Sequence, residues 1–287
     1  MERGRDAGAT PSQRHFLAQR LNQALGDSLR VSIGAQHFGI DGRLKSPARA
    51  LIPGIDESLL PKGPSGVDGV RLRQADGPAA LTLNTFINWV RQPQLMRLAG
   101  ETGFRELRFD ARCPTGIRGT PPLLELIAGN ERTVVAVTAR CADYLSLRPR
   151  KLASAYDRVT PSLSSAPWLG LLPLIRSEPS PFRYVDTAGL LKHAVGLSQT
   201  FPNRPVKLAY LYWEPVNAAQ YPAFAEHRAE LSMLADRVAG SSVTLVAQSF
   251  DELWSEWQSQ LEPDWLRGMV ARLKARYSVA IAEPSGI

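Results

Sequence analysis

The sequence predicts an α/β fold in which a mixed central sheet is flanked by helices on both faces. Three observations predict it. Strand candidates follow one another at residues 104–113, 122–128 and 133–139, and a four-residue turn separates the last two. The apolar run at 133–139 is nearly continuous, which is typical of a strand buried on both faces. A helix at 186–200 then leads into a strand at 207–215, as a helical crossover requires.

The elements around this core follow from apolar spacing and from breaker residues. Residues 12–26 have apolar side chains at helical spacing, with Gly26 as the expected end, and residues 81–100 predict a helix that Pro93 interrupts. Asp186 or Thr187 is the expected cap of the crossover helix. The later elements are a short helix near 151–156, a helix at 218–240, a strand at 242–250 and closing helices within 251–277.

Two regions differ in composition. Residues 31–80 are rich in Gly and Pro, which predicts loops and short elements. We therefore expect residues 1–80 to form an N-terminal helix with a Gly/Pro-rich extension, and residues 81–287 to form the α/β domain.

Charge and cysteine content limit the classes of protein that fit. The 287 residues have a net charge of +7 and a pI near 9.7, which is compatible with an anionic partner such as nucleic acid. Two cysteines, Cys113 and Cys141, are too few for a disulfide scaffold, so we expect packed thiols in the cytoplasm. The longest apolar run, 166–175, is far shorter than the ~20 residues of a membrane span, so no membrane association is expected.

Three short motifs stand in a fixed order along the second half of the chain. They are Arg118-Gly119-Thr120-Pro121-Pro122-Leu123-Leu124-Glu125, then Trp213-Glu214-Pro215, then His227-Arg228-Ala229-Glu230-Leu231. Together with the predicted order of elements, they make residues 81–277 resemble bacterial members of the PD-(D/E)XK nuclease superfamily. The resemblance implies the restriction-endonuclease-like form of the predicted α/β fold.

In such nucleases an acid on the second strand and the first acid of an acid-x-Lys triplet on the third strand hold Mg²⁺, and the lysine assists the attacking water. Glu125 matches the first acid, whereas Thr138 stands in place of the second acid and Arg140 in place of the lysine. Losing a carboxylate removes negative charge beside the metal, and arginine does not give up its proton. We therefore expect the catalytic positions Glu125, Thr138 and Arg140 to be degraded, with Glu125 and Arg140 forming an ion pair.

The alternative is a substituted set of ligands. Asp143 or Asp110, or else Glu101, could replace the missing acid, so that Glu125, Asp143 and Asp110 would bind Mg²⁺ through carboxylate oxygens. The expected cofactor is thus Mg²⁺ if the site works and none if it is degenerate.

Basic residues near the predicted site are candidates for contacts with phosphates. Arg148, Arg150 and Lys151 follow the third strand, and Lys192 and His193 lie on the crossover helix. His227 and Glu230, three residues apart, are expected on a solvated helix face. Trp254, Trp257 and Trp265 are expected in the core.

Other common active-site motifs are missing from the sequence. It has no Walker A loop, no dinucleotide-binding glycine motif, no Gly-x-Ser-x-Gly elbow and no His-Glu-x-x-His zinc motif. The sequence therefore predicts a nuclease-fold protein that binds nucleic acid, with DNA expected before RNA, and whose degraded metal site makes hydrolysis doubtful. The alternatives are an active Mg²⁺-dependent endonuclease or phosphodiesterase, and a non-enzymatic module that binds a protein partner or forms a homodimer.

Overall fold

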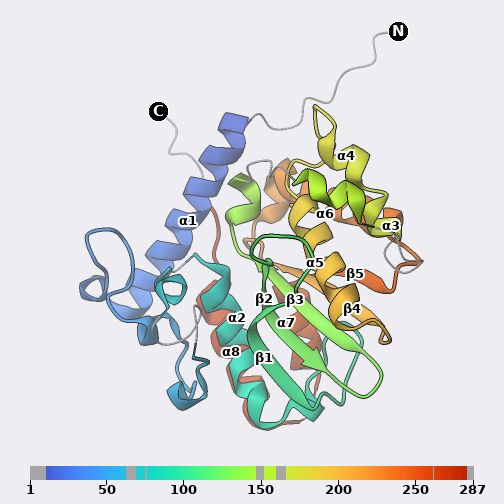
Figure 1. Cartoon of the computed structure of the whole chain (residues 1–287). Coiled ribbons are helices and arrows are strands. Elements are labelled where there is room, and N and C mark those ends of the chain that lie inside the picture. The colour runs from blue at the N-terminus through green and yellow to red at the C-terminus, as the bar shows by residue number, and fades with distance from the viewer. Residues whose placement is uncertain are drawn as a thin grey trace.

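A five-stranded mixed sheet forms the centre of the protein. The computed structural model describes residues 11–62, 69–74, 76–146, 152–159, 166–260 and 262–282. The strands lie in chain order, with β1 antiparallel to β2, β2 antiparallel to β3, and β3, β4 and β5 parallel. They are β1 (Glu106–Arg112), β2 (Leu123–Gly129), β3 (Val134–Arg140), β4 (Val206–Tyr212) and β5 (Val243–Ser249). The predicted mixed α/β architecture is confirmed (Figure 1).

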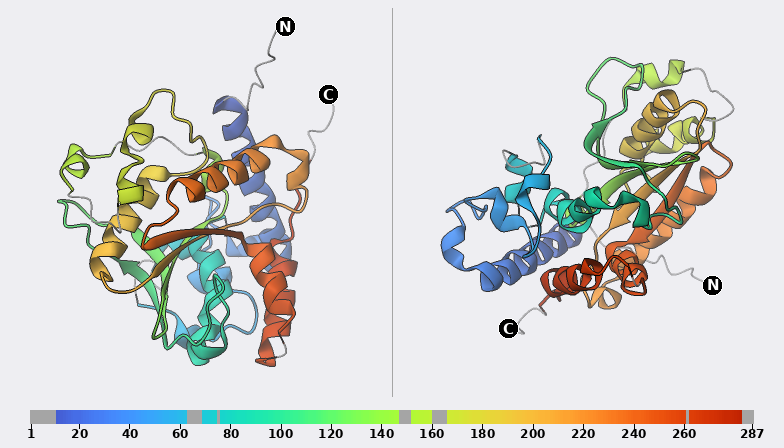
Figure 2. Two further views of the ribbon diagram at one scale, coloured as in Figure 1. Left: turned by 90° about the vertical axis from the view of Figure 1, so that its right-hand side faces the viewer. Right: turned by 90° about the horizontal axis from the view of Figure 1, so that it is seen from below.

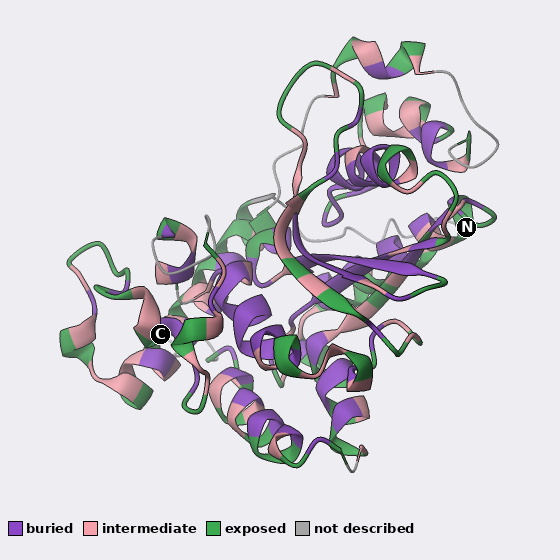
Figure 3. Cartoon of the chain, turned by 60° about the horizontal axis from the view of Figure 1, so that its bottom comes forward, coloured by how far each residue is buried: buried purple, intermediate pink, exposed green. Residues whose placement is uncertain are grey.

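The β2–β3 hairpin forms where the sequence predicts it. Asn130 makes the turn, because its Oδ1 accepts hydrogen bonds from the backbone N–H groups of Arg132 at 2.9 Å and Thr133 at 2.7 Å. Figure 3 shows the inner strands buried, whereas edge strand β1 consists of exposed and half-buried residues. Continuous apolarity therefore marks the inner strands, as expected.

Helices cover both faces of the sheet, as Figure 2 shows from two directions. One face packs against α1 (Pro11–Ile33), α2 (Pro78–Phe86), α7 (Phe250–Gln258) and α8 (Trp265–Tyr277). The other packs against α3 (Ala166–Leu169), α4 (Leu172–Arg176), α5 (Thr187–Thr200) and α6 (Pro222–Arg237). We call the buried side chains of the first face, which include Leu126 and Trp254, the first core, and those of the second face, which include Leu124 and Leu190, the second core.

Several helix boundaries differ from the prediction. The first helix continues through Gly26 to Ile33, and α2 ends at Phe86, where 3₁₀ turns over Ile87–Arg91 and Pro93–Leu95 replace the rest of the predicted helix. The short helix expected near 151–156 is a 3₁₀ turn over Ser154–Arg158. Asp186 is the cap of α5, since its Oδ1 accepts from the Gly189 N–H at 3.0 Å.

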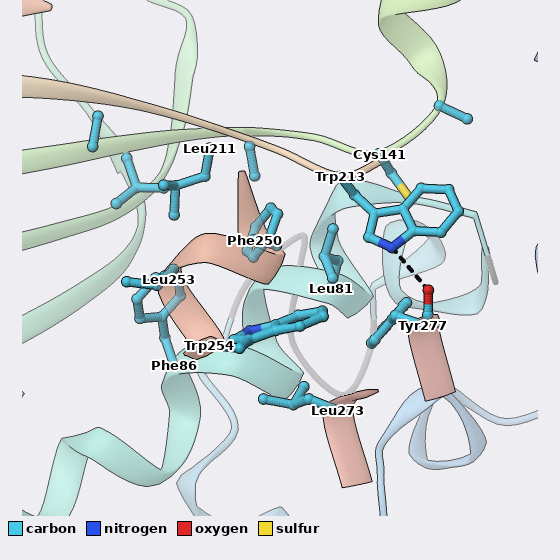
Figure 4. Packing of buried hydrophobic residues seen from close by; sticks show 14 of the residues in the cluster. Leu81, Phe86, Cys141, Leu211, Trp213, Phe250, Leu253, Trp254, Leu273 and Tyr277 are labelled. Atoms are coloured by element: carbon cyan, nitrogen blue, oxygen red, sulfur yellow. Dashed lines mark hydrogen bonds between the residues drawn. The ribbon is translucent and has the colours of Figure 1, made fainter. Parts of the chain in front are cut away.

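The first core is rich in aromatic side chains. Trp254 and Trp257 are buried in it, as predicted, and Trp265 packs partly buried against Trp89 with ring centroids 4.9 Å apart. Trp213 donates its indole N–H to the backbone oxygen of Tyr277 at 3.0 Å (Figure 4). This bond joins the end of β4 to the last turn of α8.

The segment before the sheet packs against the same core. Leu17, Leu21 and Leu25 of α1 belong to the first core, and 3₁₀ turns follow, among them η2 (Pro47–Ala50), η3 (Glu57–Leu59) and η4 (Val70–Arg73). In the described part of the chain, no helix has the length and apolarity needed to cross a membrane.

Candidate functional site

The candidate site lies at the point where the inward-facing side chains of β1 and β2 switch from one face of the sheet to the other. Phe109 pairs with Leu126 and Ala111 with Leu124, yet the first pair packs against the first core and the second pair against the second core. Asp110 lies between them with a φ of 51°, a left-handed backbone that aspartate tolerates better than most residues. The side chains of β1 and β2 on either side of Asp110 therefore pack against opposite cores, and Glu125 occupies the position on β2 that faces Asp110.

Glu125 is held by two hydrogen bonds. Its Oε2 accepts from the backbone N–H of Ala139 at 3.0 Å, and its Oε1 lies 3.2 Å from Nη2 of Arg71. The β2–β3 pairing ends at Leu126 and Val137. The Ala139 N–H beyond it therefore donates to the Glu125 carboxylate instead of to the backbone of β2. Burial raises the pKa of Glu125, while the nearby charges of Arg140 and Arg71 and the Ala139 N–H act in the opposite direction.

Arg71 reaches this position from the 3₁₀ turn η4 in the N-terminal segment. Its Nη1 lies 3.6 Å from Asp110 Oδ1, while its Nη2 contacts Glu125. The guanidinium of Arg71 therefore forms ion pairs with both carboxylates. The ion pair expected between Glu125 and Arg140 is instead formed by Arg71, which sequence analysis did not single out because no motif marks it and 54 residues separate it from Glu125.

Arg140 lies at the end of β3 with its side chain 13% exposed. Its Nη1 lies 3.6 Å from Asp143 Oδ2, and its Cζ lies 5.9 Å from the ring centre of Tyr210. Burial alone would lower the pKa of Arg140, but the charges of Asp143, Tyr210 and Glu125 raise it overall. The guanidinium therefore keeps its proton and cannot act as a base.

The other predicted site residues are dispersed. Thr138 is buried and pairs with Tyr210 on β4, and Asp143 accepts from the Cys141 N–H at 3.0 Å. Glu101 lies 2.7 Å from Lys207. Within the described residues, no three His, Cys, Asp or Glu side chains are grouped so that they could hold a metal ion. Glu125 and Asp110 share Arg71, whereas Asp143 lies with Arg140.

Only some of the predicted phosphate-contacting residues lie in the part of the chain that the structure describes. Arg148, Arg150 and Lys151 lie outside the described residues. Lys192 is half-buried on α5, and His193 beside it is buried. These two positions are thus part of a helix that packs on the sheet.

The two later motifs are joined in space. Arg228 on α6 contacts Glu214, which follows β4, at 2.6 Å. Burial raises the pKa of Glu214, and the charge of Arg228 acts in the opposite direction. The second and third motifs therefore hold α6 against the end of β4.

His227 and Glu230 are buried, so the expectation of a solvated face is wrong. Glu230 accepts from the backbone N–H groups of Arg183, Tyr184 and Val185 at 2.7, 2.9 and 3.0 Å. The signal was present in the sequence, because both residues share the apolar face of α6 with Leu231 and Leu234 at spacings of three and four.

His227 packs within a group of tyrosines. Its Nε2 lies 3.1 Å from the hydroxyl of Tyr210, and its ring stacks on Tyr144 with centroids 4.2 Å apart. Burial, together with the charges of Arg228 and Arg140, lowers the pKa of His227 to about 3. The imidazole is therefore neutral at physiological pH.

The site thus contains carboxylates that are already neutralised by arginine. No protein-family model, no curated protein and no solved structure matches this chain.

Proposed function

We propose that this chain is a nucleic-acid-binding protein built on the restriction-endonuclease-like fold, in which ion pairs have replaced the metal site and hydrolysis is lost. The mixed sheet with a hairpin followed by a helical crossover supports the fold, as do the three motifs in their order. One fold serves many functions, so the fold alone does not determine the activity, which depends on the residues of the site.

The observation that carries the proposal is the position of Arg71 between Asp110 and Glu125. A magnesium ion needs free carboxylate oxygens, but both oxygens of Glu125 already accept hydrogen bonds. A guanidinium neutralises the carboxylates without activating water. Unlike a metal ion, it does not coordinate a water molecule and lower its pKa, and it does not release its own proton. In this arrangement the carboxylate charges remain neutralised, but metal-dependent hydrolysis is lost.

The charge distribution supports binding to a polyanion. The chain carries a net charge of +7, and Arg108, Arg112 and Arg118 are exposed on edge strand β1 and in the loop that follows it. Arginine side chains on such an edge contact phosphates without reading the sequence of the bases. Binding through them would release counterions and therefore weaken as salt rises.

The test combines a binding assay with a cleavage assay. Fluorescence anisotropy with duplex and single-stranded DNA, between 50 and 300 mM salt, should give a logarithmic affinity that falls linearly with the logarithm of salt concentration (about 0.9 per phosphate contact on duplex DNA). The pair Arg112→Gln and Arg118→Gln should reduce that slope by about one each, whereas Arg237→Gln at the exposed end of α6 should leave it unchanged.

In the same preparations, Mg²⁺ or Mn²⁺ should produce no cleavage of plasmid or single-stranded DNA. Metal-dependent cleavage that disappears in Glu125→Ala would reject the proposal and establish an active nuclease. If no DNA binding is detected at any salt concentration and a stable protein partner is recovered instead, the chain is an interaction module.

A further inference from the structure

A cavity of about 500 Å³ lies between the N-terminal loops and α8. Its walls come from η2, the loop around Pro53 and Gly54, and the last two turns of α8. Its volume falls in the range of about 300–1,000 Å³ that is typical of small-molecule sites. Glu125 and Arg140, which define the candidate site of the sheet, are not among its lining residues.

Arginines line this cavity. Arg272 and Arg276 stand one helical turn apart on α8, and Arg49 projects from η2. Within the residues that the structure describes, none of the three lies within 4.0 Å of a carboxylate oxygen, although Glu57 also lines the cavity. Arg272 and Arg276 are like charges four residues apart on one helix, which destabilises it, and Arg49 adds a third positive charge at the same cavity. A bound anion would reduce this repulsion.

Two glycines leave room for the guanidinium of Arg272. A Cβ atom on Gly54 would lie 3.1 Å from Nη2, and one on Gly268 would lie 3.3 Å from Nη1. Gly54 also has a φ of +85°, a conformation that glycine adopts without strain. Among the described residues, the buried Nε of Arg272 has no hydrogen-bond partner. The absence of side chains at Gly54 and Gly268 therefore leaves room for this guanidinium, one of whose N–H groups has no partner among the described residues.

We propose that this cavity binds a phosphomonoester through Arg272, Arg276 and Arg49. Guanidinium groups bind phosphate oxygens through paired N–H donors, and such charge-assisted bonds are stronger than neutral ones. The phosphate could belong to a free nucleotide or to the 5′ end of a strand, since both present the same dianion. The inference does not depend on the nuclease-like fold or on DNA binding at the sheet.

Isothermal titration calorimetry tests it with inorganic phosphate, adenosine 5′-monophosphate, adenosine, and one oligonucleotide with either a 5′-phosphate or a 5′-hydroxyl group. The phosphorylated ligand of each pair should bind at least about tenfold more tightly than its unphosphorylated counterpart. Similar affinity for the mononucleotide and the phosphorylated oligonucleotide would identify a nucleotide site, and preference for the oligonucleotide would identify a strand-end site.

Substitutions locate the effect. Arg272→Gln should weaken binding of the phosphorylated ligand about tenfold, whereas Arg267→Gln, an exposed arginine on the same helix outside the cavity, should change it less than twofold. Arg49 is exposed, so Arg49→Gln alters no buried contact, and it should weaken binding at least threefold. This variant tests the proposal if Arg272→Gln does not fold.

Equal affinity for phosphorylated and unphosphorylated ligands would overturn the proposal, as would unchanged affinity in both Arg49→Gln and Arg272→Gln. Failure of the DNA-binding proposal is separable, because it would abolish salt-dependent binding of the 5′-hydroxyl oligonucleotide and leave mononucleotide binding intact.

Discussion

The ion pair between Arg71 and Glu125 joins a buried carboxylate to a half-buried guanidinium. The Glu125 side chain is 5% exposed and that of Arg71 is 34% exposed. Taking the carboxylate out of water costs free energy, which the guanidinium and the Ala139 N–H offset. Because water still reaches Arg71, the attraction is screened more than in a fully buried pair.

A double-mutant cycle measures this pair. From Arg71→Gln, Glu125→Gln and the double variant, urea unfolding should give a coupling free energy of about 1–2 kcal/mol. The matched control is Arg105 and Glu131, whose side chains are 70% and 72% exposed and whose coupling should stay below about 0.5 kcal/mol. Equal coupling in the two cycles would mean that Arg71 does not hold Glu125.

His227 makes stability depend on pH. The pKa of His227 is about 3 in the folded protein, against an ordinary value of 6.5. Between these values the unfolded chain binds a proton that the folded chain does not, so the free energy of unfolding falls as pH is lowered from about 6.5 towards 3. The raised pKa values of buried carboxyls such as Glu230 act in the opposite direction, which makes a comparison of variants necessary.

Comparison of the wild type with His227→Gln isolates the imidazole. Lowering the pH from 7 to 5 should cost the wild type about 2 kcal/mol more than it costs His227→Gln, as measured by urea unfolding at both values. His15→Gln, at an exposed position on α1, should behave as the wild type does. An identical pH response in wild type and His227→Gln would contradict the buried, neutral imidazole.

At this scale the sequence identified part of the site. Glu125 was recognisable because a lone acid in an apolar strand needs a partner, and Arg140 because it stands where the resemblance to nucleases places the lysine. Arg71 was not recognisable, since it belongs to a 3₁₀ turn without periodicity and its contact with Glu125 spans 54 residues. Side-chain pairing across such a separation is set by the packing of the N-terminal segment and not by local pattern.

At the scale of single elements, the strands and the hairpin were predictable and the helix ends were less so. Apolar runs mark β2, β3 and β4 because both faces of these strands are covered. Gly26 was expected to end α1, but the helix continues to Ile33 because Leu29 beyond it is buried as well. Tertiary packing here outweighs the low helix propensity of glycine.

Two helical glycines should respond in opposite ways to alanine. A Cβ on Gly196 of α5 would lie 2.3 Å from the backbone oxygen of Cys113, so Gly196→Ala should destabilise the protein by about 1–3 kcal/mol. A Cβ on Gly26 would meet the flexible end of Arg30 at 3.4 Å, so Gly26→Ala should stabilise by about 0.5–1 kcal/mol. Thermal and urea unfolding measure both, and stabilisation by Gly196→Ala would show that α5 does not pack this closely on Cys113.

At the scale of the whole molecule, Asn84 of α2 connects the N-terminal segment with α8. Its Oδ1 accepts from the Ile52 N–H at 2.9 Å, and its Nδ2 donates to the Ala50 oxygen and to the Tyr277 hydroxyl, both at 2.9 Å. The side chain is fully buried, so these groups have no access to water once the amide is removed. One residue therefore holds the loop that carries the arginine-lined cavity against the helix that completes it.

Asn84→Ala should therefore reduce the free energy of unfolding by about 3 kcal/mol, because it leaves buried donors and an acceptor without partners. Hydrogen exchange should become faster at the Ile52 amide and its neighbours before it changes in β3 and β4, since the loop loses its attachment while the sheet keeps its own bonds. The control is Asn88→Ala, two residues beyond α2, where the amide makes only a long contact of 3.7 Å with the Met269 sulfur and the expected cost is below about 1 kcal/mol. If both variants lose the same stability, or if exchange rises uniformly over the sheet, Asn84 does not fasten the N-terminal segment to the rest of the molecule.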